Sequence, residues 1–454
     1  MNILVLNGSP AGENSITLQT VLYLEKLCKK VSFSYLHVGQ RIRAMEKQFA
    51  PCAEALERAD LILFAYPVYT FLVPAQLHRF IELIKENGLN LAGKRAAQIT
   101  TSKHFYDTTA HRFIQDNCAD LGLRYIGGLS ADMEDLLKEE GRREARAFLR
   151  RVFWCMKEGI YEPSRNEPQP VPWKGMAPTL STPIAKGSKS VTLVTDLSHD
   201  GNGRLHAMIE AFRACSDCRV TVYDLAERRI DGGCLGCFRC ASDGNCVYQD
   251  GFDRFLREEI QSGDATVYAF TIRDHSMGSR FKLYDDRQFC NGHRTVTMGR
   301  PVGYLISGPL NAEENLRTLI EARAEVGGNP LVGVATDQTD PDGEILALAK
   351  SLSYALSTDT RRPANFYGVG GMKIFRDLIW QMQGLMREDH RFYKSHGFYD
   401  FPQKQRGKMA AMYLVGSMMK SKKLSRRLNG KMTEGMILPY RKLIRDAEKE
   451  QEQR

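Results

Sequence analysis

Residues 1–27, MNILVLNGSPAGENSITLQTVLYLEKL, begin with an apolar run, pass through a loop of Gly, Ser, Pro and Asn, and end in a helical pattern. This order is typical of a buried strand that turns directly into a helix. Residues 190–214, SVTLVTDLSHDGNGRLHAMIEAFRA, repeat the plan, and Leu4-Val5 correspond to Leu193-Val194. The repeat predicts two domains of one architecture.

The correspondence continues further along the chain. ERADLILFAYPVY at 57–69 is matched by QSGDATVYAFTIRD at 261–274, and GKRAAQITTSKHF at 93–105 by GRPVGYLISGPLN at 299–311. Apolar strands that alternate with amphipathic helices favour a parallel sheet covered on both faces. We therefore predict an α/β protein with two tandem, doubly wound parallel-sheet domains.

A proline-rich segment and a basic tail mark the domain boundaries. Residues 162–183 hold six of the 17 prolines, which favours an extended linker. Residues 361–454 hold 21 Lys/Arg and 9 Asp/Glu, a net charge of +12, and nine of the 17 methionines lie between 372 and 436. We assign a first domain, a linker, a second domain and a helical, Met-rich extension to residues 1–160, 161–188, 189–362 and 363–454.

Composition limits the class of protein and its surroundings. The chain has 454 residues, 43% of them hydrophobic and 26% charged, with 11 cysteines, as expected of a globular protein with reduced or metal-bound thiols. The beginning, MNILVLNGSP, lacks the basic leader of a signal peptide, so we expect a cytoplasmic protein. For the basic tail we expect packing over the two domains, with contact to a membrane surface or an acidic partner as the alternative, and no nucleic-acid binding.

Three polar loops follow predicted strands of the first domain. In NGSPAGENSITLQ, helix-start amides lie near the side chains of Ser9, Asn14, Ser15 and Thr17, a combination that suits a phosphate. This loop is neither a GxGxxG motif nor a P-loop. Pro67-Val68-Tyr69 and Thr101-Ser102 follow the next two strands. In a doubly wound sheet such loops meet at the carboxyl edge of the strands, where ligands bind.

These loops carry a specific resemblance. Gly8-Ser9-Pro10, Asn14-Ser15, Tyr66-Pro67-Val68-Tyr69 and Pro74-Ala75-Gln76-Leu77 resemble the signature of the flavodoxin-like NAD(P)H-dependent FMN reductase family, with Tyr66 in place of the customary Ser. The resemblance implies FMN, with its phosphate at Ser9, Asn14, Ser15 and Thr17 and its ring against Pro67, Val68, Tyr69, Thr101 and Ser102. It also implies NAD(P)H as the electron donor.

The second domain departs from that signature. Its first loop reads TDLSHDGNG, and the carboxylates of Asp196 and Asp200 would repel a phosphate. Its second loop reads Thr271-Ile272-Arg273-Asp274-His275, which is charged where a flavin ring would stack. We expect no FMN in this domain. Arg273, Asp274 and His275 are candidate catalytic residues that could bind a carboxylate or relay a proton; a loop held by a local Arg–Asp pair is the alternative.

Only the second domain has a cysteine-rich loop, GGCLGCFRCASDGNCVYQDGFD at 232–253. Cys234, Cys237, Cys240 and Cys246 form C-x2-C-x2-C-x5-C, whose first three members have the spacing of bacterial 4Fe-4S runs. The loop resembles that of iron–sulfur flavoproteins, and also that of FMN reductases without a cluster. Free thiols and a four-cysteine zinc site are the alternatives. A second pair, Cys215 and Cys218, is expected at the surface near a helix end.

Together these features predict a flavin-dependent oxidoreductase. Electrons would pass between NAD(P)H or a redox partner, FMN in the first domain and a 4Fe-4S cluster in the second, because a flavin exchanges electrons in pairs or singly. The alternatives are a simple NAD(P)H:FMN or quinone reductase without a cluster, and a non-enzymatic electron-transfer or scaffold protein. The expected partner is a small molecule or a redox protein. Since the family often forms dimers, the chain could form a homo-oligomer, or its two domains could imitate one.

Overall fold

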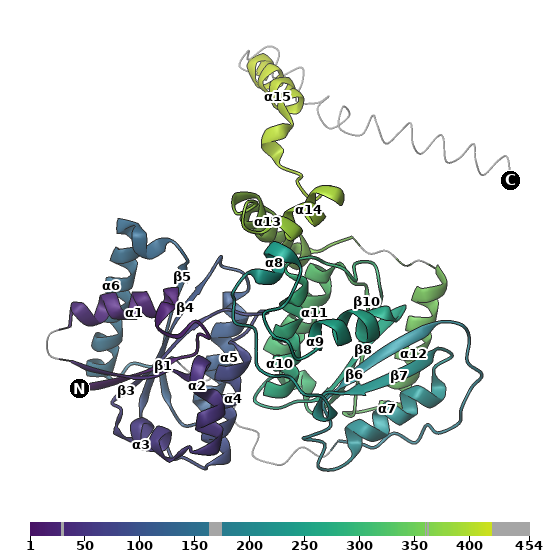
Figure 1. Cartoon of the computed structure of the whole chain (residues 1–454), viewed down its shortest axis with the longest axis horizontal. Coiled ribbons are helices and arrows are strands. Elements are labelled where there is room, and N and C mark those ends of the chain that lie inside the picture. The colour runs from purple at the N-terminus through teal and green to yellow at the C-terminus, as the bar shows by residue number, and fades with distance from the viewer. Residues whose placement is uncertain (29–30, 163–174, 359, 361–362, 420–454) are drawn as a thin grey trace. The chain divides into compact units, whose positions relative to one another are not determined.

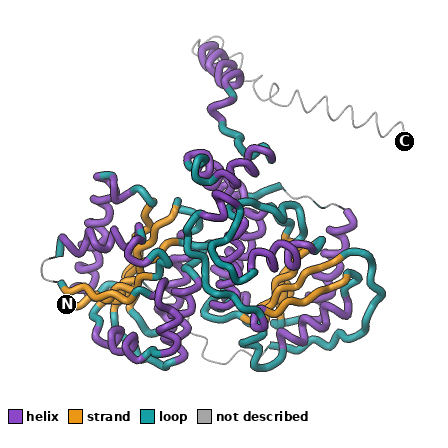
Figure 2. Tube along the Cα trace, viewed as in Figure 1, coloured by secondary structure: helices purple, strands orange, loops and turns teal. Residues whose placement is uncertain are grey.

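The computed structural model describes residues 1–28, 31–162, 175–358, 360 and 363–419. They divide into a compact unit, Met1–Phe392, and the beginning of a second one, Tyr393–Arg454. The first unit contains two separate sheets, drawn in orange in Figure 2, each with helices on both faces (Figure 1). No helix in the described part of the chain is long and apolar enough to cross a membrane.

The first sheet has five parallel strands in the order β2-β1-β3-β4-β5. Its apolar runs are buried on both sides, as a covered parallel sheet requires. Ile3 and Val5 of β1 face α1 and α6, whereas Leu4 and Leu6 face the opposite helix layer. The strands are β1 Asn2–Asn7, β2 Ser32–Leu36, β3 Leu61–Pro67, β4 Arg95–Ser102 and β5 Arg124–Asp132. The helices are α1 Ile16–Lys26, α2 Val38–Lys47, α3 Ala50–Arg58, α4 Ala75–Glu86, α5 Asp107–Asp120 and α6 Glu139–Glu158.

The second sheet repeats this order as β7-β6-β8-β9-β10, also with parallel strands. Both sheets therefore have the 2-1-3-4-5 order of flavodoxin-like folds, and the predicted fold class is confirmed. The strands are β6 Ser190–Thr195, β7 Arg219–Asp224, β8 Ala265–Thr271, β9 Val302–Ser307 and β10 Leu331–Thr336. The helices are α7 Arg204–Cys215, α8 Arg239–Asp243, α9 Phe252–Arg254, α10 Ser279–Arg287, α11 Glu314–Gly327 and α12 Pro341–Thr358, with a π-helical turn at Phe255–Glu259.

The two domains pack through corresponding helices. Helix α4 contacts α10, and α5 contacts α11 (Figure 1). One hydrophobic cluster extends from the first sheet through these helices to the second sheet, and it includes Phe80, Phe113 and Tyr284. This shared core explains why the tandem domains form one compact unit.

The segments outside the domains follow the predicted helices in part. Of the predicted linker, residues 163–174 lie outside the described residues, and 175–189 run without a helix or strand to β6. The extension begins with α13 Phe366–Gln381, which packs on α11 within the first unit, and α14 Arg387–Ser395 follows. Helix α15 Arg406–Met419 belongs to the second unit, and residues 420–454 of the predicted helical extension lie outside the described residues. Contact of the extension with a membrane or an acidic partner stays a prediction.

One minor prediction is wrong. Cys218 was expected at the surface, but its side chain is buried, because β7 begins at Arg219 and brings it against the core of α7 and α12. Cys215 is half-buried at the end of α7.

Candidate functional site

A cavity of about 340 Å³ lies where the carboxyl edge of the first sheet meets the cysteine-rich loop. This volume is within the usual range for small-molecule and cofactor sites. It is lined by all nine residues predicted to bind FMN and by all four cysteines of the 232–253 loop. The sequence prediction assigned these two groups to different domains, and the structure brings them into one chamber. The lining residues in question are Ser9, Asn14, Ser15, Thr17, Pro67, Val68, Tyr69, Thr101, Ser102, Cys234, Cys237, Cys240 and Cys246.

The phosphate loop is built by local hydrogen bonds. The Asn7 side chain accepts from the amide of Ser9 (3.1 Å) and donates to the carbonyl of Gly12 (3.0 Å). Ser15 is the N-cap of α1, where its hydroxyl accepts from the amide of Leu18. The hydroxyls and amides of this loop, at the positive end of α1, form a site suited to a phosphate dianion.

The same loop touches the ring side of the cavity. The hydroxyl of Thr17, on α1, is hydrogen-bonded to that of Thr101, at the end of β4. Val68 donates its amide to the carbonyl of Thr101 (3.2 Å), so the loop after β3 is held against the loop after β4. These contacts fix the relative positions of the predicted phosphate and ring sites.

Close packing behind the phosphate loop gives a testable prediction. A Cβ at Gly39, in the first turn of α2, would lie 2.2 Å from the carbonyl carbon and oxygen of Ser9. Gly39→Ala must therefore displace Ser9, and we expect at least a tenfold loss of FMN affinity with about 1–3 kcal/mol of destabilisation. Flavin fluorescence titration measures the affinity. Gly201→Ala is the control, because Gly201 lies in the second domain's counterpart of the phosphate loop and a Cβ there would have no atom within 4 Å. Equal FMN affinities in the two variants would contradict the assignment of Ser9 to the phosphate site.

The second domain has a carboxylate where the first offers amides. The Asp200 side chain accepts from the amides of Leu205 (3.1 Å) and His206 (2.8 Å), so it caps the start of α7. Asp196 likewise accepts from the amide and hydroxyl of Ser198. These bonds use the donors that a phosphate would need, which supports the prediction that FMN binds only in the first domain.

The cysteine loop is anchored by a buried ion pair. Arg287, at the end of α10, forms two 2.8 Å hydrogen bonds to Asp250, and both side chains are 1% exposed. Burial by itself would raise the pKa of Asp250, but the hydrogen bonds from Arg287 outweigh it and hold the pKa at about 2. Arg287 also donates to the carbonyl of Gly232 (3.0 Å) and lies over the ring of Tyr248. Both ends of the loop are thus fixed to α10.

The four thiols line the chamber, and two of them, Cys234 and Cys240, are not poised as nucleophiles. Burial raises the pKa of Cys240 to about 11 and the pKa of Cys234 further, so as free thiols both would be protonated near neutral pH. Among the described residues, no three of these sulfurs lie within 4.8 Å of one another. A tetrahedral zinc site with Zn–S bonds of about 2.3 Å needs sulfurs about 3.8 Å apart.

Tyr69 joins the two halves of the site. It belongs to the predicted flavin loop, and its hydroxyl lies against Gly236, where a Cβ would be only 2.2 Å away. Gly236 has φ of +63°, a conformation that glycine adopts without strain. Burial, followed by the nearby Cys234, raises the pKa of Tyr69. The side chain is therefore a neutral contact between the flavin loop and the cysteine loop.

Helix α13 covers part of the chamber, which sequence reasoning missed. Ile374, Phe375 and Leu378 line the cavity, and Phe375 stacks on Phe105 with ring centroids 4.3 Å apart. The hydrophobic pattern of α13 predicted a helix packed over the domains, but nothing in it indicated the surface that it covers. These three side chains make the cavity wall more apolar than the loops of the two domains alone would make it.

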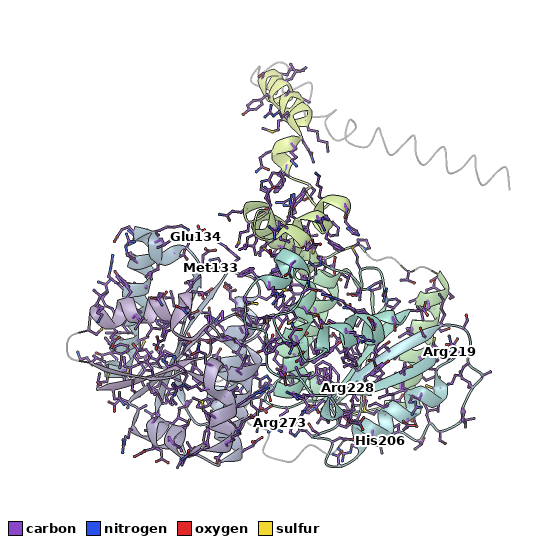
Figure 3. All side chains as sticks on the ribbon, viewed as in Figure 1. Met133, Glu134, His206, Arg219, Arg228 and Arg273 are labelled. Atoms are coloured by element: carbon purple, nitrogen blue, oxygen red, sulfur yellow. The ribbon has the colours of Figure 1, made fainter. Side chains whose placement is uncertain are left out.

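Arg273, Asp274 and His275 are not part of the cavity lining. They lie at the boundary between the domains, where Figure 3 labels Arg273. Arg273 Nε is 3.6 Å from Asp274 and Arg273 also pairs with Glu86, while His275 lies 3.2 Å from Asp120 and 3.0 Å from Glu313. This arrangement favours the alternative weighed from the sequence, a loop held by ion pairs, over a role in catalysis.

Comparisons with known proteins agree with this geometry. Residues 1–115 match the family of NADPH-dependent FMN reductases. The match confirms, for the first domain, the predicted relation to that family, and with it the prediction of an NAD(P)H-dependent flavin oxidoreductase. A curated relative, the iron–sulfur flavoprotein of Archaeoglobus fulgidus, is 23% identical over 176 residues, which cover 36% of this chain and 79% of the relative.

Similar solved structures each cover about a third of this chain. An FMN-dependent NADH-azoreductase from Bacillus anthracis, in complex with FMN, is 14% identical and covers 35% of this chain and 99% of its own, with a TM-score of 0.27. General stress protein 14 from Treponema denticola, also in complex with FMN, is 13% identical and covers 34% and 98%, with a TM-score of 0.27.

Proposed function

We propose that the chain is an NAD(P)H-dependent flavin oxidoreductase whose first domain binds FMN and whose cysteine loop holds a 4Fe-4S cluster. The single observation that carries the proposal is the shared chamber, in which the nine predicted flavin residues and the four cysteines face one cavity. Bound FMN would accept two electrons from NAD(P)H and release them singly, and the cluster would take one electron at a time.

Each part of the chamber has a defined role in this proposal. The loop of Ser9, Asn14, Ser15 and Thr17 would hold the phosphate, and Pro67, Val68, Tyr69, Thr101 and Ser102 would hold the ring. The raised pKa of Cys234 and Cys240 means that cluster binding would release protons from these thiols. Helix α13 would exclude water from this side of the chamber, with Ile374 and Phe375 against the cofactors.

The electron acceptor is proposed to be a small molecule or a redox protein. A second cavity, of about 160 Å³, adjoins the first, and Thr70, Phe105 and Phe375 line both. Its wall also contains the half-buried cation Arg323, which pairs with the buried Asp285. A small acceptor with a polar or anionic group would find a complementary partner there.

The cofactor assignment is tested on protein purified without oxygen. We expect about one FMN and about four iron atoms per chain, and a broad visible absorption that bleaches with dithionite. Cys234→Ser and Cys240→Ser should each lose the iron and keep the FMN, whereas Cys28→Ser, outside the chamber, should keep both.

Other results would replace the proposal with one of its alternatives. FMN with no iron would identify a simple NAD(P)H:FMN or quinone reductase, and zinc in place of iron would identify a structural four-cysteine site. Turnover of NAD(P)H with an artificial acceptor distinguishes all of these from a non-enzymatic electron-transfer or scaffold protein, for which no turnover is expected.

A further inference from the structure

The contact between the two domains has two related halves. In each domain the loop after the third strand has two consecutive non-glycine residues with positive φ, Thr70-Phe71 and Asp274-His275. Each loop leads into a helix whose first amide is bonded to a carboxylate of the other domain. Ala75 donates to Asp286 (2.8 Å), and Ser279 donates to Glu82 (2.7 Å).

In this correspondence between the two halves, Lys282 takes the place of His78. Lys282 lies one helical turn before Asp286, and His78 lies one turn before Glu82. In the first half, the Lys282 ammonium bonds to Asp286, to the hydroxyl of Thr70 (2.5 Å) and to the carbonyl of Tyr69 (2.9 Å). In the other half the same positions hold His78, Glu82 and Asp274. A lysine cation is thus replaced by an imidazole, and the neutral Thr70 by a carboxylate.

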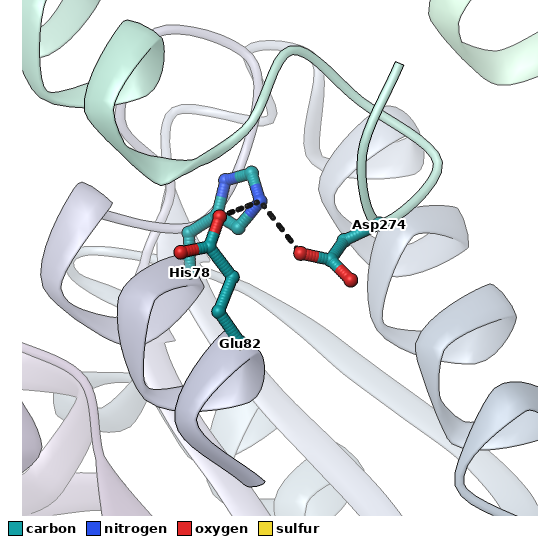
Figure 4. Close-up of side chains that lie close together, drawn as sticks. All are labelled: His78, Glu82 and Asp274. Atoms are coloured by element: carbon teal, nitrogen blue, oxygen red, sulfur yellow. Dashed lines mark ion pairs between the residues drawn. The ribbon is translucent and has the colours of Figure 1, made fainter. Parts of the chain in front are cut away.

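The His78 half contains buried polar atoms without partners. Among the described residues, neither ring nitrogen of His78 nor Asp274 Oδ2 has a hydrogen-bond partner. His78 is fully buried and the Asp274 side chain is 6% exposed. His78 Nε2 points between Glu82 Oε1 and Asp274 Oδ2, at 3.9 Å from each (Figure 4). Leaving such atoms unpaired is costly, so a bound group at this position would satisfy them.

The charges around this point do not balance. The linked ion pairs contain six carboxylates and three permanent cations, and the carboxylates exceed the cations by two even when His275 is counted as protonated. The outer oxygens of the two carboxylates are paired, Glu82 Oε2 with Arg79 at 2.9 Å and Asp274 Oδ1 with Lys85 at 2.8 Å. The inner oxygens, Glu82 Oε1 and Asp274 Oδ2, have only Arg273 Nε beside them among the cations of this cluster, at 3.6 Å from each. The groups are Glu46, Glu82, Glu86, Asp120, Asp274 and Glu313, with Arg79, Lys85, Arg273 and His275.

We propose that His78, Glu82 and Asp274 bind a divalent metal ion that joins the two domains. The three candidate ligand atoms lie within 4.8 Å of one another. Tetrahedral ligands at about 2.1 Å from a metal are about 3.4 Å apart, so each His–carboxylate distance would shorten by about half an ångström. The ion would supply the two missing positive charges and give His78 Nε2 and Asp274 Oδ2 their partner.

The donor set indicates the class of ion. One imidazole and two carboxylates suit Mn²⁺ or Zn²⁺ better than a soft ion. Because zinc would also bind the cysteine loop, Mn²⁺ is the sharper probe. None of the three ligands lines the flavin and cysteine chamber, so metal binding at this site can be measured without an assay of enzyme activity.

The test is a Mn²⁺ titration of the full chain after its metals have been removed with a chelator. The electron paramagnetic resonance signal of unbound Mn²⁺ measures how much of the ion the chain has bound. We expect one ion per chain and a higher thermal midpoint with Mn²⁺. Asp274→Asn and Glu82→Gln should weaken binding at least tenfold and abolish the midpoint shift. Glu86→Gln removes a charge of the same cluster from a half-exposed position and should keep the wild-type affinity.

Two results would overturn the proposal. A wild-type chain that binds no Mn²⁺ at 100 times the protein concentration, with an unchanged midpoint, would mean that water or a proton occupies the space. Equal weakening by Glu86→Gln and Asp274→Asn would mean diffuse attraction by the cluster and not ligation. Since the wild-type titration does not depend on any variant, a variant that fails to fold leaves the first criterion in force.

Discussion

Replacing Asp286 with alanine is expected to destabilise the Met1–Phe392 unit by about 3–5 kcal/mol, because it leaves the Lys282 ammonium buried without its counter-charge. Both side chains of this pair are 0% exposed. The same substitution deprives the Thr70 hydroxyl and the Ala75 amide of their acceptor. Since both belong to the first domain, the loss should loosen the contact between the domains as well as α10. Denaturant unfolding, monitored by far-ultraviolet circular dichroism, measures the change.

A double variant separates the effect of the unpaired Lys282 charge from the effect of the lost contact between the domains. The double variant Lys282→Met/Asp286→Leu removes both buried charges of this pair, and we expect most of the lost stability to return. Glu54→Ala removes a carboxylate from an exposed pair with Arg58 and should change stability by less than about 1 kcal/mol. A loss below about 1 kcal/mol for Asp286→Ala would show that water reaches Lys282 and that the contact opens readily.

Arg287→Met is expected to release the cysteine loop while the sheets stay folded. Methionine keeps much of the side-chain volume but leaves Asp250 buried and unpaired, at a cost of about 3–5 kcal/mol. Unfolding of the 232–253 loop lets Asp250 reach water, so the effect should be local. Under the proposed function, iron content should fall more than tenfold and FMN content should stay near one per chain. Hydrogen exchange of the loop and metal analysis measure both effects.

Arg287→Lys is the matched comparison for this variant. Lysine keeps the charge but cannot form the two parallel hydrogen bonds or lie flat over Tyr248, so an intermediate loss is expected. Slow hydrogen exchange of the 232–253 loop in Arg287→Met would contradict the role of the ion pair. Fast exchange with wild-type iron content would instead separate loop anchoring from metal retention.

The two sheets and the flavin loops of the chamber could be predicted because their signals are local. Buried parallel strands give continuous apolar runs, and the polar loop after each strand lies at the carboxyl edge in every such fold. Those two rules predict that Ser9, Tyr69 and Thr101 lie together at this edge, and all three line the chamber. The cysteine loop followed from its own spacing.

The contact between the domains could not be predicted in the same way. Glu82, Lys282 and Asp286 occupy helix positions that a single-domain reading assigns to a solvent-facing side, since charged residues are seldom fully buried. Their burial depends on a partner surface that lies 197 to 216 residues away along the chain. The same is true of Arg273, whose charge suggested a ligand but whose partner Glu86 lies on the other domain.

Joining the two domains in one chain has a consequence for how the halves can differ. In a dimer of identical subunits, any change at one half of the contact is copied at the other. Here Lys282 stands on one side and His78 on the other, and Asp200 blocks one phosphate loop while the other stays open. Fusion therefore freed each half to specialise, and because the halves are tethered, dilution cannot separate the flavin loop from the cysteines that face it.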